Sequence, residues 1–320
     1  RYPTGLPSVD DFELRGVALP PLASGQVQVR NVWLSVDPYM RGRMNDVPSY
    51  VAPFRLDEPL DGAAVGQVVE SRHDGFRPGD FVLHRFGWRD EVVADGNAFT
   101  ALSSLYPPQA WLNTLGPIGA TAYFGLLSVG GAKPGETVFV SAAAGAVGSV
   151  VVQIAKLKGM RVIGSAGGAS KCDFVRSLGA DAVIDYKAPG TMIEKLRQAA
   201  PDGIDVYFDN VGGDHLDAAL GCAKQGARVA ICGMIQMYNS SEVVPLANLF
   251  RVITARIRVQ GFIVSDFRSR WDEFQSDMEG WVAGGKVAGH ETIMEGLNVV
   301  PSAFLALFSG KNTGKLLVKL

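Results

Sequence analysis

Residues 141–149, SAAAGAVGS, decide how the rest of the chain is interpreted. They follow the apolar run 137–140, which is typical of a buried strand, and they open a helical pattern that ends at Gly159. A small-residue turn of this kind is either a plain tight corner or a loop that lets the backbone approach the pyrophosphate of a dinucleotide. In the second case the N–H groups and the dipole at the start of the helix would bind the phosphates.

The turn contains an imperfect dinucleotide fingerprint. In the pattern Gly-x-Gly-x-x-Gly an alanine replaces the first glycine, whereas Gly145 and Gly148 keep the other two positions. Gly145 would let the backbone approach the pyrophosphate, and Gly148 would let the helix pack closely on the strand. We therefore expect a dinucleotide to contact Ala144, Gly145, Ala146, Val147 and Gly148.

The surrounding sequence supports the second interpretation, because residues 118–288 alternate between short buried strands and helices. One of the helices begins at Thr191, and Glu194 three residues later completes a capping box. Six alternations indicate an α/β fold with a doubly wound parallel sheet, the Rossmann arrangement. The expected strands are 137–140, 161–166, 182–185, 205–209, 228–233 and 258–264.

Residues 1–117 have a different rhythm. Short apolar runs alternate with turns rich in glycine, proline and aspartate, which predicts a compact, β-rich, antiparallel and barrel-like domain. At the other end of the chain we expect an apolar helix over 300–309 and a terminal strand over 315–320. We expect residues 289–320 to complete the first domain and residues 118–288 to form the second.

Composition excludes several classes of function. The chain has 320 residues, 47% of them hydrophobic, which favours two domains with separate cores. A net charge of −2 with both signs dispersed gives no basic footprint for nucleic acid. No apolar run reaches the roughly 18 residues of a membrane span, and the first residues lack the layout of a signal peptide.

Cysteine and histidine usage points to a reducing compartment and away from metal. The three cysteines are scattered and odd in number, which is typical of reduced thiols in a cytoplasmic protein. The four histidines have no close spacing, so we expect no metal site. One of them, His215, begins a helix, and we expect it to be solvated.

The end of the second strand of the parallel sheet indicates which dinucleotide binds. An NAD-binding protein would place a carboxylate there for the ribose 2′-hydroxyl, but residues 164–171 contain no acid. The small residues, Ser165 among them, leave room for a 2′-phosphate, which Lys171 could neutralise and to which Tyr186 could add a hydroxyl. An ordinary solvated lysine is the alternative, although a cation in the first turn of a helix opposes the helix dipole. The sequence therefore favours NADP(H).

Polar residues also follow the fourth and fifth strands. Asn210 comes directly after residues 205–209, and Cys232, Gly233 and Tyr238 lie at or just past the end of the fifth strand. Ligands of open α/β sheets bind beyond the carboxyl ends of the strands. We therefore expect these residues to contact the cofactor, with Tyr238 also facing the substrate, although Asn210 could simply cap a loop.

At these residues the chain resembles a known family. It is similar to the zinc-independent medium-chain dehydrogenase/reductases, in the branch of prostaglandin reductases and alkenal double-bond reductases. The similarity runs over nearly the whole chain. The motifs that carry it are VDPYMRGRM (36–44), TAYFGL (121–126), AAAGAVGS (142–149), FDNVGG (208–213), ICGMI (231–235) and GKNTGK (310–315).

The resemblance implies a GroES-like catalytic domain, a Rossmann domain, NADPH, and reduction of the C=C bond of enones and enals in a homodimer. Hydride would add to the β-carbon, and a tyrosine hydroxyl together with the cofactor ribose would stabilise the enolate. By position the resemblance puts Lys171 and Tyr186 on the 2′-phosphate. It puts Asn210 and Asn312 near the nicotinamide, and Tyr39 and Tyr238 in the substrate cleft as catalytic candidates.

Several alternatives stay open at this point. Tyr39 follows Asp-Pro and could simply pack a turn. The protein could be a quinone oxidoreductase with the same cofactor site, or a protein that holds NADPH without turnover. The missing metal cluster fits conjugate reduction, because a hydrogen-bond donor can stabilise an enolate, whereas alcohol dehydrogenation needs a Lewis acid.

Overall fold

The computed structural model describes residues 1–240 and 244–320. They form two compact units. The first comprises Arg1–Asn113, Glu291–Asn312 and Leu316–Leu320, and the second comprises Thr114–His290 and Thr313–Lys315.

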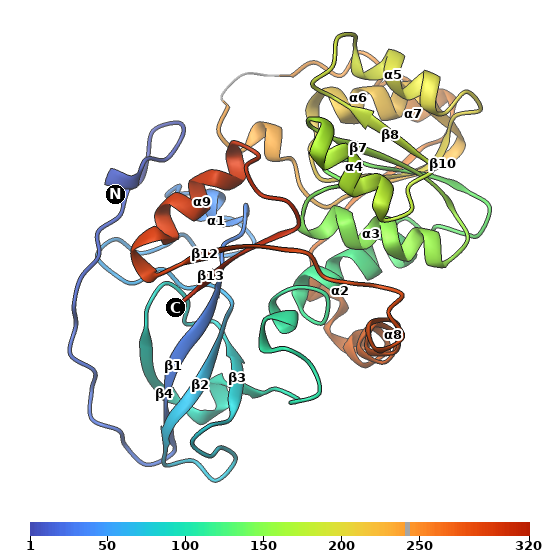
Figure 1. The fold of residues 1–320 in the computed structure, drawn as a ribbon. Coiled ribbons are helices and arrows are strands. Elements are labelled where there is room, and N and C mark those ends of the chain that lie inside the picture. The colour runs from blue at the N-terminus through green and yellow to red at the C-terminus, as the bar shows by residue number, and fades with distance from the viewer. Residues whose placement is uncertain (241–243) are drawn as a thin grey trace. The chain divides into compact units, whose positions relative to one another are not determined.

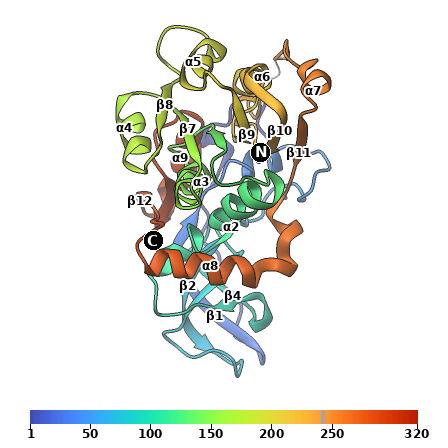
Figure 2. The ribbon, with the colours of Figure 1, turned by 90° about the vertical axis from the view of Figure 1, so that its right-hand side faces the viewer.

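The second unit is built on a six-stranded sheet in the order β11-β10-β9-β6-β7-β8, in which every pairing is parallel (Figure 1). The edge strands β8 and β11 lie on opposite sides of this unit in Figure 2. The predicted doubly wound α/β fold is confirmed. The strands are β6 (Thr137–Val140), β7 (Arg161–Ala166), β8 (Ala182–Asp185), β9 (Ile204–Asp209), β10 (Ala223–Ile231) and β11 (Arg258–Gly261).

The predicted strand bounds are exact for three of the six strands. β6, β7 and β8 have the predicted bounds, and β9 begins one residue early. The other two differ. β10 begins five residues before the predicted strand and ends before Cys232, and β11 ends at Gly261. The extra residues of β10 include Gly226, which has a φ of 76°, and the pairing of β10 with β9 shifts register there.

Helices fill the connections between these strands. Helix α5 begins with the predicted capping box, in which Thr191 N donates to Glu194 Oε2 at 2.9 Å. α5 and α6 pack together on one face of the sheet, over a core that includes Phe139 and Tyr207. The helices are α2 (Pro117–Phe124), α3 (Ala146–Leu157), α4 (Ala169–Ser177), α5 (Met192–Ala199), α6 (Gly213–Cys222), α7 (Arg251–Thr254) and α8 (Trp271–Ala283).

The first unit contains a seven-stranded sheet in the order β12-β13-β1-β2-β3-β5, with β4 also paired to β1. The predicted terminal strand is confirmed, because β13 pairs antiparallel with β1. The strands are β1 (Gln26–Ser35), β2 (Ala64–Ser71), β3 (Phe81–His84), β4 (Glu91–Asp95), β5 (Thr100–Ala101), β12 (Glu291–Glu295) and β13 (Lys315–Lys319). The helices are α1 (Met40–Arg43) and α9 (Val300–Phe308).

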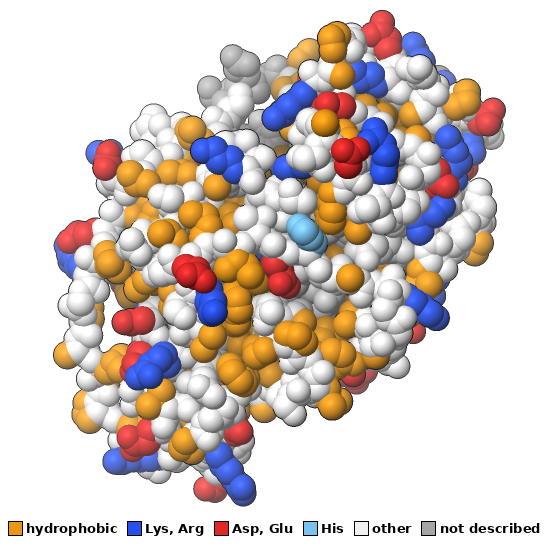
Figure 3. All heavy atoms as spheres, in the orientation of Figure 1, with side chains coloured by type: hydrophobic (Ala, Val, Ile, Leu, Met, Phe, Trp, Pro, Cys, Tyr) orange, Lys and Arg blue, Asp and Glu red, His pale blue; other side chains and the backbone are white. Residues whose placement is uncertain are grey.

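The surface agrees with the dispersed charge of the sequence. On the face drawn in Figure 3, lysine and arginine side chains are interspersed with aspartate and glutamate. Within residues 1–240 and 244–320, every helix is too short or too polar to cross a membrane.

Candidate active site

The glycine-rich turn joins β6 to α3 in a very tight path. A Cβ atom on Gly148 would lie 2.3 Å from the carbonyl oxygen of Ala142, so no side chain fits there. Ala142 itself has a φ of 46°. Gly145 is the N-cap residue of α3, and no side chain of the described residues caps this helix end. The first N–H groups of α3 are therefore available to an anion.

The neighbouring residues of this turn differ in exposure. Ala144 is buried, and its carbonyl oxygen accepts a hydrogen bond of 2.7 Å from Gly314 N. Ala146 and Val147 are partly exposed. The predicted contact residue Asn312 belongs to the first unit and is half-buried in the loop before β13.

At the end of β7, the turn at Gly167 is covered by two side chains from the end of β8. A Cβ atom on Gly167 would lie 2.7 Å from the hydroxyl oxygen of Tyr186 and 3.0 Å from Cε of Lys187. Asp185 Oδ1 links the two loops, because it accepts hydrogen bonds from Gly168 N at 3.0 Å and from Lys187 N at 2.9 Å. These two backbone hydrogen bonds lower the pKa of the Asp185 carboxyl.

Lys171 lies in the first turn of α4, near the same glycine turn. Burial lowers the pKa of its ammonium group, and the positive charge of Lys187 lowers it further. Among the described residues, no carboxylate forms an ion pair with Lys171 or Lys187. Two neighbouring cations that repel each other suit an anionic ligand. The sequence analysis missed Lys187, although its position next to Tyr186 was a usable signal.

Ser165 and His215 form a buried pair beneath this turn. Ser165 is fully buried, and its Oγ lies 2.8 Å from Nε2 of His215. The expectation that His215 is solvated was wrong, because its side chain is 7% exposed. Burial lowers the pKa of His215 to about 4. The reason is that α6 packs its first turn on the sheet, which turns the imidazole inward toward β7.

The loop after β9 is held by a polar network. Asn210 donates from its backbone N to Ser141 Oγ at 2.9 Å and from Nδ2 to Ser141 O at 2.8 Å. The carboxyl of Asp209 is fully buried and accepts from the Tyr207 hydroxyl at 2.6 Å and from Gly212 N at 2.8 Å. Burial raises the pKa of this carboxyl. Asn210 therefore fixes the loop, and its amide nitrogen already has a protein partner.

Tyr238 folds back over the ends of β9 and β10. A Cβ atom on Gly233 would lie 3.1 Å from the Tyr238 hydroxyl oxygen, which also accepts from Met234 N at 3.4 Å. Cys232 and Gly233 donate from their backbone N atoms to Asp209 O at 2.8 and 3.1 Å. Burial, followed by the charge of Asp209, raises the pKa of the Cys232 thiol to about 12, so this thiol is neutral at physiological pH.

Tyr39 lies in the first unit, as the residue before α1. Its hydroxyl accepts from Arg85 Nη2 at 3.4 Å, and burial raises its pKa. Arg43 forms a hydrogen-bonded ion pair with Asp61, with Nη2 at 2.9 Å from Oδ2. This pair anchors the segment that carries Tyr39.

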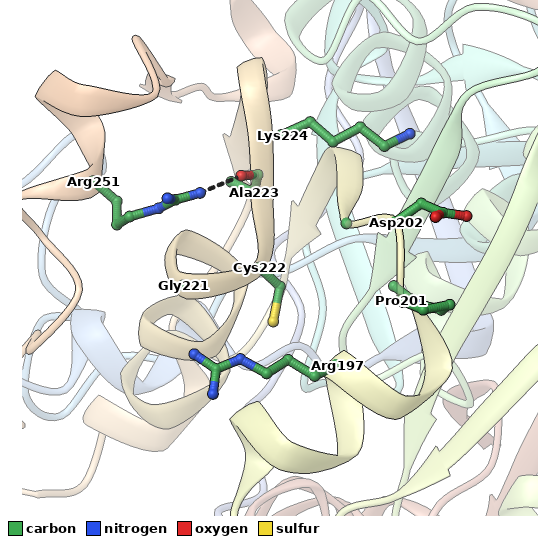
Figure 4. Close-up of a pocket in the computed structure, with 10 residues that line it drawn as sticks. Arg197, Pro201, Asp202, Gly221, Cys222, Ala223, Lys224 and Arg251 are labelled. Atoms are coloured by element: carbon green, nitrogen blue, oxygen red, sulfur yellow. Dashed lines mark hydrogen bonds between the residues drawn. The ribbon is translucent and has the colours of Figure 1, made fainter.

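A pocket of about 410 Å³ lies at the other end of the parallel sheet, where β9 and β10 begin (Figure 4). Two of its three cations serve the fold. Arg251 donates to Ala223 O at 2.7 Å, and Lys224 pairs with Asp205 at 2.7 Å. Ligands of such sheets bind at the carboxyl ends, so we do not assign the active site to this pocket.

In the described part of the chain, no group of three or more His, Cys, Asp or Glu side chains is placed to hold a metal ion.

The chain matches two protein families. Residues 1–102 match the N-terminal domain of oxidoreductase, and residues 146–280 match zinc-binding dehydrogenase. The NADPH-dependent curcumin reductase of Escherichia coli (strain K12) is 42% identical over 99% of this chain and 94% of its own length. Prostaglandin reductase 1 of Mus musculus is 42% identical over 98% of this chain and 95% of its own length. The NADP(+)-dependent 2-alkenal reductase of Nicotiana tabacum is 40% identical over 99% of this chain and 94% of its own length.

Solved structures agree. The structure of CurA from Vibrio vulnificus in complex with NADPH is 42% identical, with a TM-score of 0.94 over 99% of this chain and 96% of that chain. The quinone oxidoreductase of Escherichia coli in complex with NADPH has a TM-score of 0.80 over 98% of both chains, but at 20% identity it shows only the same fold.

The chain therefore belongs to the medium-chain dehydrogenase/reductase family of oxidoreductases. Within this family it falls in the zinc-independent branch that includes the prostaglandin, curcumin and 2-alkenal reductases.

Two buried imidazoles make the stability of the protein depend on pH. The pKa of His84 and that of His215 are both lowered to about 4, chiefly by burial. Between about pH 6.5 and pH 4 the unfolded chain binds more protons than the folded protein, so stability falls as the pH falls. We expect a loss of about 2 kcal/mol per imidazole between pH 7 and pH 5.

Urea unfolding of the His84→Gln variant at both pH values tests this expectation. The variant should lose less stability than the wild type on acidification, whereas a variant of the exposed His290, His290→Gln, should behave like the wild type. An unchanged pH dependence in His84→Gln would contradict the assignment.

Proposed function

We propose that this protein is an NADPH-dependent reductase of the C=C bond of α,β-unsaturated ketones and aldehydes. Relatives named for NADPH and for 2-alkenals, similar over the whole chain, support the proposal. The geometric observation that carries it is the Tyr238 hydroxyl beside Gly233, at the carboxyl ends of β9 and β10. Bound NADPH would supply the hydride that adds to the β-carbon of the substrate.

The residues at the carboxyl ends of the parallel strands fit this cofactor. The uncapped start of α3 suits a pyrophosphate, and Gly148 keeps that helix end close to the strand. A 2′-phosphate would be held by the ammonium groups of Lys171 and Lys187 and by a hydrogen bond from the hydroxyl of Tyr186. We propose further cofactor contacts at Ser165, Asn210, Cys232, Gly233 and Asn312, of which Ser165 has a fully buried side chain.

The chain's part in the chemistry is to stabilise negative charge on the substrate oxygen. A phenol donates one hydrogen bond. As charge develops on the oxygen, that bond strengthens, which raises turnover rather than binding alone. We propose Tyr238 as the main donor. Tyr39 is the second candidate, because Arg85 donates to its hydroxyl and leaves the phenolic proton for another acceptor.

NADPH oxidation with a panel of simple enones, 2-alkenals and quinones tests the reaction class. We expect turnover of the enones and alkenals, with the same rate after dialysis against a strong chelator. Turnover of quinones alone would indicate a quinone oxidoreductase. The likeness to a solved quinone oxidoreductase supports that alternative by its fold alone. Binding of NADPH without any turnover would favour a non-catalytic protein.

Substitution of Lys171 tests the choice of cofactor. A hydrogen bond to a charged group contributes about 1.5–3 kcal/mol. Lys171→Ala should therefore weaken NADPH binding by this amount and leave NADH binding nearly unchanged, as measured by fluorescence titration. Arg161→Ala, which removes an exposed cation at the opposite end of β7, is the matched control. Equal losses for both cofactors would rule out a contact between Lys171 and the 2′-phosphate.

Tyr238→Phe tests the proposed donor. Loss of a single oxyanion donor costs about 2.7–4 kcal/mol, and Tyr39 or the cofactor ribose would share the load. We expect kcat for an enone to fall at least roughly tenfold, which corresponds to about 1.4 kcal/mol, with NADPH affinity intact. A variant that keeps full kcat would leave Tyr238 as a pocket wall and make Tyr39 the leading donor.

We also propose a cytoplasmic homodimer. The three cysteines are free thiols, which suits a reducing compartment. The edge strand β11 is exposed along its length, and the nearby side chains of Phe250 and Ile253 are 70% and 71% exposed. An exposed edge strand beside apolar side chains is suited to pair with a second copy. A monomer mass in sedimentation experiments would refute the dimer.

A further inference from the structure

We propose that His215 is a positioning residue that gives the cofactor site its preference for a 2′-phosphate, by supporting Tyr186 from beneath. The inference rests on the proposed NADPH site. His215 itself does not reach the surface of that site as a ligand, because its side chain is 7% exposed. Its effect would pass through the tyrosine that it contacts.

The imidazole is held on three sides. Its Nε2 lies 2.8 Å from Oγ of the fully buried Ser165. Its ring is parallel to that of Phe139, with an interplanar angle of 3° and centroids 6.3 Å apart. The Tyr186 ring stands on it edge to face, at 76° and with centroids 5.6 Å apart. A side chain constrained in this way forms a rigid support for the phenol.

Tyr186 needs such a support because the rest of its environment is open. Its side chain is 45% exposed, and it lies at the end of an edge strand of the sheet. On one side the phenol covers the turn at Gly167, where a Cβ atom would lie 2.7 Å from its hydroxyl oxygen. His215 is the aromatic contact that fixes the angle of the ring over this turn. Without it, the hydroxyl would lose its fixed place beside Lys187 at the Gly167 turn.

The chemistry of His215 suits this role. Burial keeps the ring neutral by lowering its pKa to about 4, so the imidazole acts through its packing and its hydrogen bond with Ser165 rather than through charge. The tether to Ser165 also explains why a serine hydroxyl is buried at the end of β7. Ser165 and His215 thus connect β7 to the first turn of α6, and Tyr186 adds the end of β8.

Two nucleotide fragments test the proposal without turnover. Adenosine 2′,5′-bisphosphate carries the 2′-phosphate, whereas 5′-AMP lacks it. Their dissociation constants are measured by calorimetry for the wild type, His215→Ala and Ser165→Ala. We expect His215→Ala to weaken the bisphosphate about fivefold and to change 5′-AMP less than twofold. Ser165→Ala removes the buried hydroxyl that pairs with His215 and keeps the Ser165 backbone, the part of this residue that could contact the cofactor. It should give a smaller loss of the same selectivity. Gln198→Ala, which removes an exposed, uncharged side chain on the neighbouring helix α5, is the control and should match the wild type.

A double-variant comparison separates positioning from a general loss of structure. If His215 acts through Tyr186, then Tyr186→Ala should cost much less bisphosphate affinity in the His215→Ala background than in the wild type. Additive effects, or equal losses for both fragments, would overturn the proposal. If His215→Ala does not fold, Ser165→Ala decides, and wild-type selectivity in that variant would overturn it. A wild type that binds both fragments equally would instead refute the proposed cofactor.

Discussion

The structure of the proposed site depends on how closely α3 begins beside the turn that follows β6. The 2.3 Å that would separate a Cβ atom of Gly148 from the Ala142 carbonyl leaves room for a hydrogen atom only. This contact fixes both the direction of α3 and the exposure of its first N–H groups. The other candidate residues of the second unit lie at the ends of neighbouring strands. They can contact the proposed cofactor only if its pyrophosphate binds at the start of α3.

The loops at these strand ends are held by buried polar groups rather than by their own packing. Asp209 connects β9 to its loop through the backbone N atoms of Val211 and Gly212, and Ser141 fastens Asn210 to the end of β6. The hydrogen bonds converge on Oδ1 of Asp209, whereas its buried Oδ2 has no partner among the described residues. The convergent bonds favour one conformation of the loop. The Tyr238 hydroxyl lies beside Gly233 next to that loop, so the loop would preorganise the proposed donor.

The parallel sheet could be predicted from the sequence, but the side-chain contacts that shape the candidate site could not. β6, β7 and β8 are short segments with apolar residues that lie between turns, and this pattern predicts where each strand begins and ends. The start of β10 was missed because Lys224 and Gln225 resemble a loop, and the pairing with β9 shifts register between Ala223 and Arg228. His215 was misjudged because its burial comes from strands far away in the sequence, β6 and β7, which no local pattern reports.

Asp185 shows why the choice of cofactor cannot be inferred from a count of charges. It is an acid close to the turn where a 2′-phosphate would bind, and a free carboxylate there would repel that group. Its Oδ1 instead accepts from the backbone N atoms of Gly168 and Lys187. The carboxylate thereby shapes the turn and holds the backbone of Lys187 in place. A free carboxylate at this position would repel the 2′-phosphate of NADPH. Because Asp185 instead accepts two backbone hydrogen bonds, it supports the turn and the backbone of Lys187.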